Sequence, residues 1–292
     1  MVIIGTRPEA VKLAPLVLEL AADPELAPVV TLTGQHREMV DQILELFSVR
    51  GDHDLDILQE GQTLTDVTVR ALTGLERVLD QDPVDGVIVQ GDTTTAFAGS
   101  LAAFYRGVPV FHVEAGLRTD TPRSPFPEEM NRRLTTRIAS LHLAPTPSSA
   151  ANLRREAVEP GTIVVTGNTV IDALRWTAGR SPDYGDPALA DLDADRRRVL
   201  LVTAHRRESW GAAMEGVGAA LAELAADPDL LIVFPIHRNP VVRNAIVPRL
   251  EGRGNVIVVE PLGYAPFVRL MARADVILSD SGGVQEEGPA LG

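Results

Sequence analysis

The sequence predicts an α/β protein with two domains, each built on a parallel sheet. Short runs rich in Val and Ile alternate with longer segments of helical spacing, which is typical of consecutive β-α units. The chain has 292 residues, 45% of them hydrophobic, which exceeds one average domain and suffices for two cores. A stretch rich in Gly, Pro and Asp, residues 179–195, interrupts the alternation.

The predicted strands fall into two series. The first comprises Val2 to Ile4, Pro28 to Leu32, Gly86 to Gln90, Val108 to Val113, Leu141 to Ala144 and Thr162 to Val165. The second comprises Val199 to Thr203, Leu230 to Pro235, Asn255 to Val259 and Ala274 to Leu278. We therefore predict an N-terminal domain over residues 1–180, a linker over 181–197 and a C-terminal domain over 198–292. Ligands of open α/β sheets bind outside the carboxyl ends of the strands, so the expected site is a cleft between the domains.

Composition excludes several classes of function. There is no cysteine, hence no disulfide, thiolate nucleophile or Cys-based zinc site. A net charge of -13 argues against non-specific binding to nucleic acid or to an anionic membrane. The sequence has no run of 18 apolar residues and no signal-peptide pattern at MVIIGTRPEA, so we expect a cytoplasmic protein.

The first motif, Gly5-Thr6-Arg7-Pro8-Glu9, follows a strand and opens a helix. Glycine permits the tight turn, and the helix N-terminus with Arg7 and Lys12 offers positive charge to an anion. The spacing is not GxGxxG, which weighs against a dinucleotide site. A capped helix with incidental charges is the alternative.

A second strand–turn–helix motif lies at Leu278 to Glu287. Ser281 and the backbone amides of Gly282 and Gly283 are suited to a close approach by a pyrophosphate. Glu287, about one turn later, is suited to accept hydrogen bonds from sugar hydroxyls. An ordinary helix cap explains the same residues equally well.

Three carboxylates form the candidate catalytic group. Asp92 and Glu114 each follow a predicted strand, and Glu128 lies in the segment Pro125 to Arg132. Crowded carboxylates raise one another's pKa, so one can be protonated while another is ionised, as acid–base chemistry requires. Alternatively, Asp92 caps a helix, Glu128 faces a helix dipole, and nearby arginines neutralise them in simple ion pairs.

His205, which follows a strand of the second domain together with Arg206 and Arg207, is the first imidazole candidate and His237 the second. These groups are suited to stabilise charge on a departing phosphate. The histidines at 53, 112 and 142 have no such neighbours and are expected at the surface or in the core. No spacing of ligand residues indicates a metal site.

In order along the chain, these motifs resemble the non-hydrolysing UDP-N-acetylglucosamine 2-epimerases. The resemblance rests on GTRPEAVKLAPL, TGQHREM, QGDTTTAFAGSLAAFY, HVEAGLRT, PFPEEMNRRL, VTGNTVIDAL, TAHRRES and SDSGGVQEE. It implies two Rossmann-like domains facing a cleft (glycosyltransferase-B-like), a homodimer, and reversible conversion of UDP-GlcNAc to UDP-ManNAc for bacterial surface polysaccharides. It also implies anti elimination of UDP to 2-acetamidoglucal followed by re-addition, without a redox cofactor.

The same resemblance implies roles for single residues. Asp92, Glu114, Glu128 and His205 match catalytic positions, and Arg7, Lys12, Phe267, Ser281, Gly283 and Glu287 match nucleotide-binding positions. Gln35 to Glu38 match a regulatory substrate site, but Gly61 stands where the family has a basic residue.

The family carries further residues after SGGxQEE, so the resemblance implies an incomplete second domain and weak or no activity for residues 1–292. Three other functions stay open: a glycosyltransferase of the same fold, a hydrolysing epimerase, and a nucleotide-sugar-binding protein without catalysis.

Overall fold

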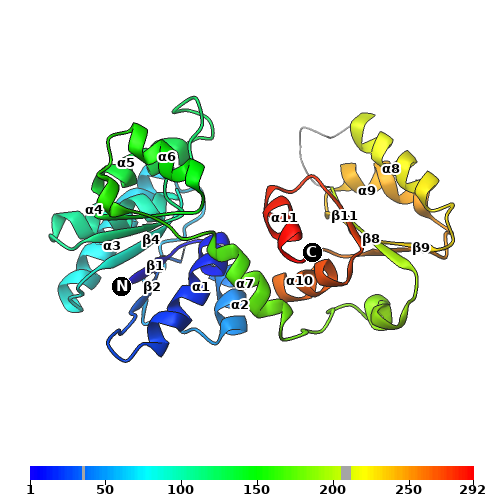
Figure 1. Ribbon diagram of the computed structural model, residues 1–292, viewed down its shortest axis with the longest axis horizontal. Helices are drawn as coiled ribbons and strands as arrows, with labels where there is room; N and C mark the ends of the chain where they lie inside the picture. The colour runs from blue at the N-terminus through cyan, green and yellow to red at the C-terminus, as the bar shows by residue number, and fades with distance from the viewer. Residues whose placement is uncertain (35–36, 205–211) are drawn as a thin grey trace. The chain divides into compact units, whose positions relative to one another are not determined.

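A computed structural model describes residues 1–34, 37–204 and 212–292 (Figure 1). The chain divides into two compact units, Met1–Ala173 and Leu174–Gly292. Each unit holds one parallel sheet with helices on both faces (Figure 1), so the predicted α/β fold class with two Rossmann-like domains is confirmed.

The first sheet has seven strands in the order β3-β2-β1-β4-β5-β6-β7. Their bounds are β1 Val2–Ile4, β2 Val30–Leu32, β3 His53–Asp54, β4 Val87–Gln90, β5 Val110–Val113, β6 Leu141–Ala144 and β7 Ile163–Val165. After β1 the chain adds β2 and β3 on one side, and it then crosses to place β4 on the other side of β1. The order of strands therefore reverses between β1 and β4, which is the point where ligands bind in open parallel sheets.

Among the described residues, seven α-helices connect and follow these strands. They are α1 Arg7–Ala22, α2 Arg37–Phe47, α3 Leu64–Gln81, α4 Thr94–Tyr105, α5 Glu128–Ile138, α6 Pro147–Arg155 and α7 Thr169–Ala178. Threonine side chains cap several N-termini: Thr63 accepts from the amide of Asp66 in α3, and Thr93 accepts from the amide of Ala96 in α4. One core of this unit joins Ile3, Val87 and Val89 of the sheet to apolar residues of α3 and α4.

The second sheet has four strands in the order β10-β9-β8-β11. The elements are β8 Arg198–Thr203, α8 Ala212–Leu224, β9 Leu230–Pro235, α9 Pro240–Leu250, β10 Val256–Val259, α10 Tyr264–Arg273, β11 Val276–Ser279 and α11 Gly282–Glu287. Here the order reverses between β8 and β11.

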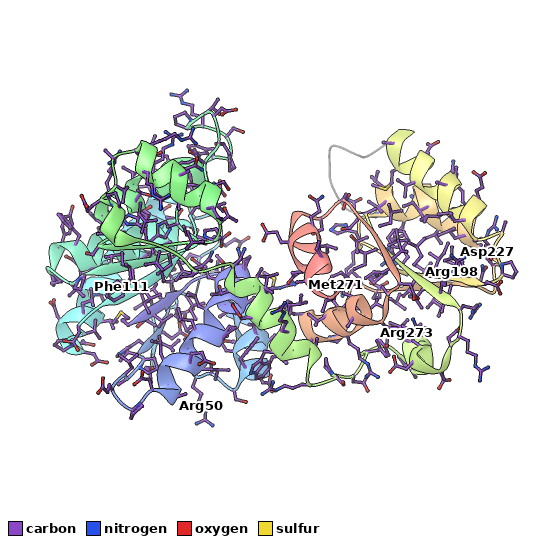
Figure 2. All side chains as sticks on the ribbon, in the orientation of Figure 1. Arg50, Phe111, Arg198, Asp227, Met271 and Arg273 are labelled. Atoms are coloured by element: carbon purple, nitrogen blue, oxygen red, sulfur yellow. The ribbon has the colours of Figure 1, made fainter. Side chains whose placement is uncertain are left out.

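Alternate residues of β8 and β9 point into two separate cores. Val199 and Leu201 join a core with α10, in which Met271 is buried, while Leu200 and Val202 join a core with α8 and α9 (Figure 2). This alternation explains why the strands are apolar throughout: both faces of the sheet are covered. At the start of β8, Arg198 pairs with Asp227 at 3.0 Å on the surface (Figure 2).

The segment predicted as a linker, 181–197, is part of the second unit. It forms two short 3-10 turns, Pro187–Leu189 and Leu192–Ala194, and buries Tyr184, Leu189 and Leu192 in the core of that unit. The buried residues stand singly between Gly, Pro and Asp residues and show no periodicity. Their packing therefore could not be predicted from the sequence pattern. The division between the units falls inside α7, and the domain boundaries at 180 and 198 stay a prediction.

Candidate active site

Two turns of the first unit lie where the order of its strands reverses. One follows β1 and contains Gly5 and Thr6, and the other follows β4 and contains Gly91, Asp92 and Thr93. Glu114 follows β5, the next strand in the sheet. The parallel sheet thus brings Asp92 and Glu114 to the carboxyl ends of neighbouring strands, as the sequence predicts.

Glu114 has an unusual backbone conformation and strong partners. Its φ angle is 63°, in the left-handed region that non-glycine residues rarely adopt. Its Oε2 atom accepts from Lys12 Nζ at 2.5 Å and from Gln90 Nε2. The Lys12 and Glu114 side chains are 16% and 9% exposed. Strained backbone of this kind concentrates at functional sites, where surrounding contacts hold it in place.

Lys12 lies on the second turn of α1, and its ammonium is already paired with a carboxylate. The sequence predicts that this lysine binds an anion. The structure shows in addition that its charge is partly balanced by Glu114. Arg7, the first residue of α1, is exposed.

Asp92 is held by α5. Its Oδ2 atom lies 2.6 Å from Arg132 Nη2, and its carbonyl oxygen accepts from Asn131 Nδ2 at 3.0 Å. Burial raises the pKa of Asp92, and the nearby Arg132 charge opposes that shift. The structure therefore includes the ion pair that sequence reasoning gave as the alternative role of these arginines.

Glu128 is the first residue of α5 and is half-buried. Its negative charge is close enough to contribute to the raised pKa of Asp92. All three predicted carboxylates thus belong to one region of the first unit, with Lys12 and Arg132 beside them.

Glu129, which sequence reasoning did not select, is fully buried next to Glu128. It accepts from the Thr119 amide at 3.1 Å and from Arg133 Nε at 2.6 Å, and it lies 3.6 Å from Arg132 Nε. The signal available in the sequence was an acidic residue with an arginine four positions later on the same helix face. Glu129 thus lies within ion-pair distance of Arg132, the arginine that contacts Asp92.

The Ser-Gly-Gly turn lies at the corresponding reversal in the second sheet. Ser281 precedes α11, and its amide donates to Ser279 Oγ at 2.9 Å. Ser279 Oγ is also 2.6 Å from Thr203 Oγ1, so the ends of β8 and β11 are joined. Gly282 and Gly283 are exposed, whereas Glu287 is buried. The backbone of this turn is thus open to a ligand.

Phe267 lies on α10 and is half-buried against the core of the second unit. His205 and Arg206 to Glu208 lie outside the described residues, as do Gln35 and His36. His237 is exposed, and its Nδ1 atom accepts from the Asn239 amide at 3.1 Å.

The remaining histidines have structural partners. His53 pairs with Asp82 at 3.1 Å, and His112 and His142 are buried on adjacent strands. Burial lowers the pKa of His112 to about 4. These three therefore match the expected surface or core positions.

A pocket of about 580 Å³ in the first unit lies between β3 and α3 and contains none of the candidate residues. Among residues 1–34, 37–204 and 212–292, no cluster of three His, Cys, Asp or Glu side chains is arranged to hold a metal ion. Within the same ranges, no helix is both long and apolar enough to cross a membrane.

The sequence of this chain is closely similar to those of one protein family. Residues 18–292 match the family model described as UDP-N-acetylglucosamine 2-epimerase. The UDP-N-acetylglucosamine 2-epimerase of Escherichia coli K12 is 50% identical over 299 residues, covering all of this chain and 79% of that protein. The Yersinia pestis enzyme of the same name is 49% identical, with the same coverage.

A solved structure shows the same similarity. The crystal structure of UDP-GlcNAc 2-epimerase from Neisseria meningitidis bound to UDP-GlcNAc is 45% identical, with a TM-score of 0.84. The match covers 99% of this chain and 80% of that one.

Proposed function

The chain belongs to the UDP-N-acetylglucosamine 2-epimerase family, and we propose that it interconverts UDP-GlcNAc and UDP-ManNAc by eliminating and re-adding UDP. The observation that carries the proposal is the group of carboxylates at the strand ends of the first sheet. Asp92 and Glu114 follow neighbouring strands, and the charge of Glu128 acts on Asp92.

The chemistry explains why several carboxylates are needed. The proton on C2 of the sugar is not adjacent to a carbonyl, so it becomes removable only as the diphosphate departs and leaves positive character on the ring. In our proposal one carboxylate accepts this proton and another returns a proton to the opposite face. Burial raises the pKa of Asp92 while the Arg132 charge opposes that shift, and a carboxyl in such surroundings is suited to proton transfer.

The departing diphosphate needs hydrogen-bond donors and positive charge. We assign these to the amides of Gly282 and Gly283, the hydroxyl of Ser281 and the guanidinium of Arg7. His205 keeps its proposed catalytic role, Phe267 a role in binding the nucleotide, and Glu287 a role in accepting hydrogen bonds from sugar hydroxyls. Because the proposed steps are proton transfers and the elimination and re-addition of UDP, the proposed reaction needs no redox cofactor.

We further propose that the protein acts as a homodimer in the cytoplasm and that bacterial surface polysaccharide synthesis consumes its product. Exposed aromatic side chains support an interface between copies: Phe104 and Tyr105, at the end of α4, are 60% and 59% exposed. Light scattering on the purified protein tests the dimer, and a monomeric mass would contradict it.

The proposed reaction is tested by incubating the protein with UDP-GlcNAc in deuterated water and following C2 by NMR. UDP-ManNAc that carries deuterium at C2 is the expected product, and Glu114→Gln is expected to suppress its formation. Stoichiometric release of free ManNAc would indicate a hydrolysing enzyme instead. Turnover only in the presence of an acceptor would indicate a glycosyltransferase, and thermal protection by UDP without exchange at C2 would indicate a binding protein.

A further inference from the structure

Glu9 is a buried carboxylate with no role in the proposed reaction. It is the third residue of α1 and is only 1% exposed. Glutamate is rarely buried unless strong donors surround it, because an ionised carboxylate loses its hydration. Burial raises the pKa of Glu9, while hydrogen bonds oppose that shift.

Three donors surround this carboxylate, and they come from two different turns. Oε2 accepts from the amides of Gly5 at 2.9 Å and Thr6 at 2.6 Å. Oε1 accepts from the Thr93 hydroxyl at 2.5 Å. The first two donors precede Arg7 in the turn after β1, whereas Thr93 directly follows Asp92 in the turn after β4.

Glu9 therefore joins the two turns across the point where the strand order reverses. The turn that carries Asp92 is also held by other buried groups. The Gly91 carbonyl accepts from His112 Nε2 at 2.7 Å, and the Asp92 carbonyl accepts from Asn131. Glu9 supplies the hydrogen-bonded connection from this turn to the residues that precede Arg7.

Thr6 and Glu9 form a capping box at the start of α1, and a second capping box in the same unit, at the start of α3, shows how Glu9 differs from an ordinary capping residue. In α3, Asp66 accepts from the amide of Thr63 at 2.8 Å and from its hydroxyl at 2.7 Å. Thr63 is exposed, Asp66 is half-buried, and the two are only three positions apart, so the interaction is local to the helix end. The box in α1 is buried, and its glutamate extends to a residue 84 positions away.

We propose that Glu9 is a positioning residue that fixes the turn of Asp92 relative to the turn that precedes Arg7. This inference rests on the proposed epimerase function. Both carboxylate oxygens act as acceptors at once. Glutamine has one acceptor oxygen, which can keep the two backbone donors while its NH2 group donates to the Thr93 hydroxyl, so Glu9→Gln removes the charge and reverses the bond to Thr93.

The test removes the link from the Thr93 side, where folding is least at risk. Thr93→Val deletes the hydroxyl at nearly constant shape, and Thr93→Ser retains it. Because Thr93 also caps α4 through the Ala96 amide at 3.0 Å, the matched control is Thr63→Val, which removes the cap of α3. Glu9→Gln and the double variant Glu9→Gln/Thr93→Val complete the set, with Asp66→Asn as the control for Glu9→Gln.

Two measurements are made on each variant. Hydrogen exchange of the peptide that contains Gly5 and Thr6 reports the link itself, and kcat and KM for deuterium incorporation at C2 report its effect on the reaction. Thr93→Val is expected to accelerate exchange at Gly5 and Thr6 and to lower kcat about tenfold to a hundredfold, with KM changing far less. Thr93→Ser is expected to restore both, and the double variant to be no slower than the slower single variant because both substitutions act on the same link.

Unchanged exchange at Gly5 and Thr6 in Thr93→Val would overturn the inference. So would a loss of kcat no greater than that of Thr63→Val, or independent effects of the two substitutions in the double variant. If the wild-type protein forms no UDP-ManNAc, the proposed function fails separately, and the exchange data alone then decide whether Glu9 joins the turns. If Glu9→Gln does not fold, Thr93→Val and Thr93→Ser still give the result.

Discussion

Replacement of Arg132 by methionine tests how the region around Asp92 is held together. The guanidinium lies 2.6 Å from Asp92 and 3.6 Å from Glu129, and the three side chains are 11%, 26% and 0% exposed. Methionine has a similar length and adapts to the space that is vacated, so the main loss in Arg132→Met is the charge.

The magnitude follows from what each carboxylate retains. Removing one partner of a buried ion pair typically destabilises a protein by about 3–5 kcal/mol because the remaining charge is left unpaired. Glu129 keeps the Thr119 amide and Arg133, and water reaches part of Asp92. We therefore expect a loss of about 2–3 kcal/mol in the free energy of unfolding, which lowers Tm by about 4–12 °C for a unit of this size.

The loss depends on pH in a defined direction. Burial raises the pKa of Asp92 and Arg132 opposes the shift, so Arg132→Met raises that pKa further. A carboxyl with a raised pKa in the folded state contributes stability below its unfolded pKa and loses it as pH rises through its folded pKa. The destabilisation of Arg132→Met is therefore greatest at neutral pH and smaller in acid.

Denaturant unfolding at pH 8 and pH 5, followed by circular dichroism, measures both effects. The control is Arg106→Met, which removes an exposed arginine that pairs with Asp80 at 2.8 Å and is expected to change stability little. Asp92→Asn is expected to recover part of the stability lost in Arg132→Met because it removes the unpaired charge. Equal stability of the Arg132 and Arg106 variants, or no recovery by Asp92→Asn, would refute this reasoning.

Three further predictions follow from single residues of the first unit. The pKa of His112, lowered by burial to about 4, means that the unfolded chain binds a proton below pH 6.5 that the folded chain excludes. Wild-type stability should thus fall by up to about 3 kcal/mol between pH 6.5 and 4, and His112→Gln should flatten that part of a pH series of unfolding curves. Lys12→Met removes the ion pair to Glu114 and is expected to lower kcat/KM for UDP-GlcNAc about a hundredfold, with Lys12→Arg retaining more activity in the same NMR assay. Gly116 has a φ of 89°, and a Cβ there would overlap a carbonyl of α6. Gly116→Ala should therefore lower the free energy of unfolding by about 2 kcal/mol or more, as measured by thermal unfolding. Gly161→Ala is the control and should leave the free energy of unfolding nearly unchanged, because a Cβ at Gly161 would contact no other atom.

Much of the fold was accessible from sequence because parallel strands covered on both faces are continuous apolar runs. Strands such as Leu141–Ala144 and Leu230–Pro235 have the predicted bounds. Strand β3, His53–Asp54, was missed because it is two residues long, polar and at the edge of the sheet. Sequence patterns reveal strands through their buried apolar residues, and a short edge strand such as β3 has no buried residue.

In the candidate site, too, some residues could be predicted from the sequence and others could not. Asp92 and Glu114 were selected because polar residues directly after apolar strands reach a shared edge of a sheet. Glu9 and Glu129 were not selected, although both are almost completely buried. Their burial depends on donors that are distant in sequence, such as the Thr93 hydroxyl, and only the folded chain reveals those partners. The local signals available were the capping-box spacing of Thr6 and Glu9 and the spacing of Glu129 and Arg133.

The central position of β1 affects how the first unit assembles during synthesis. Strand β1 is made first, and Val2 pairs with Val30 of β2 and with Ile88 of β4. A growing chain can form β1, β2 and β3 early, but one edge of β1 stays unpaired until β4 emerges. From then on, β5, β6 and β7 join in the order of their synthesis, each at the free edge. Until the last of these strands joins, the nascent chain therefore presents an apolar strand edge to other chains, first on β1 and then on each newly added strand, and a chaperone that covers this edge would benefit it.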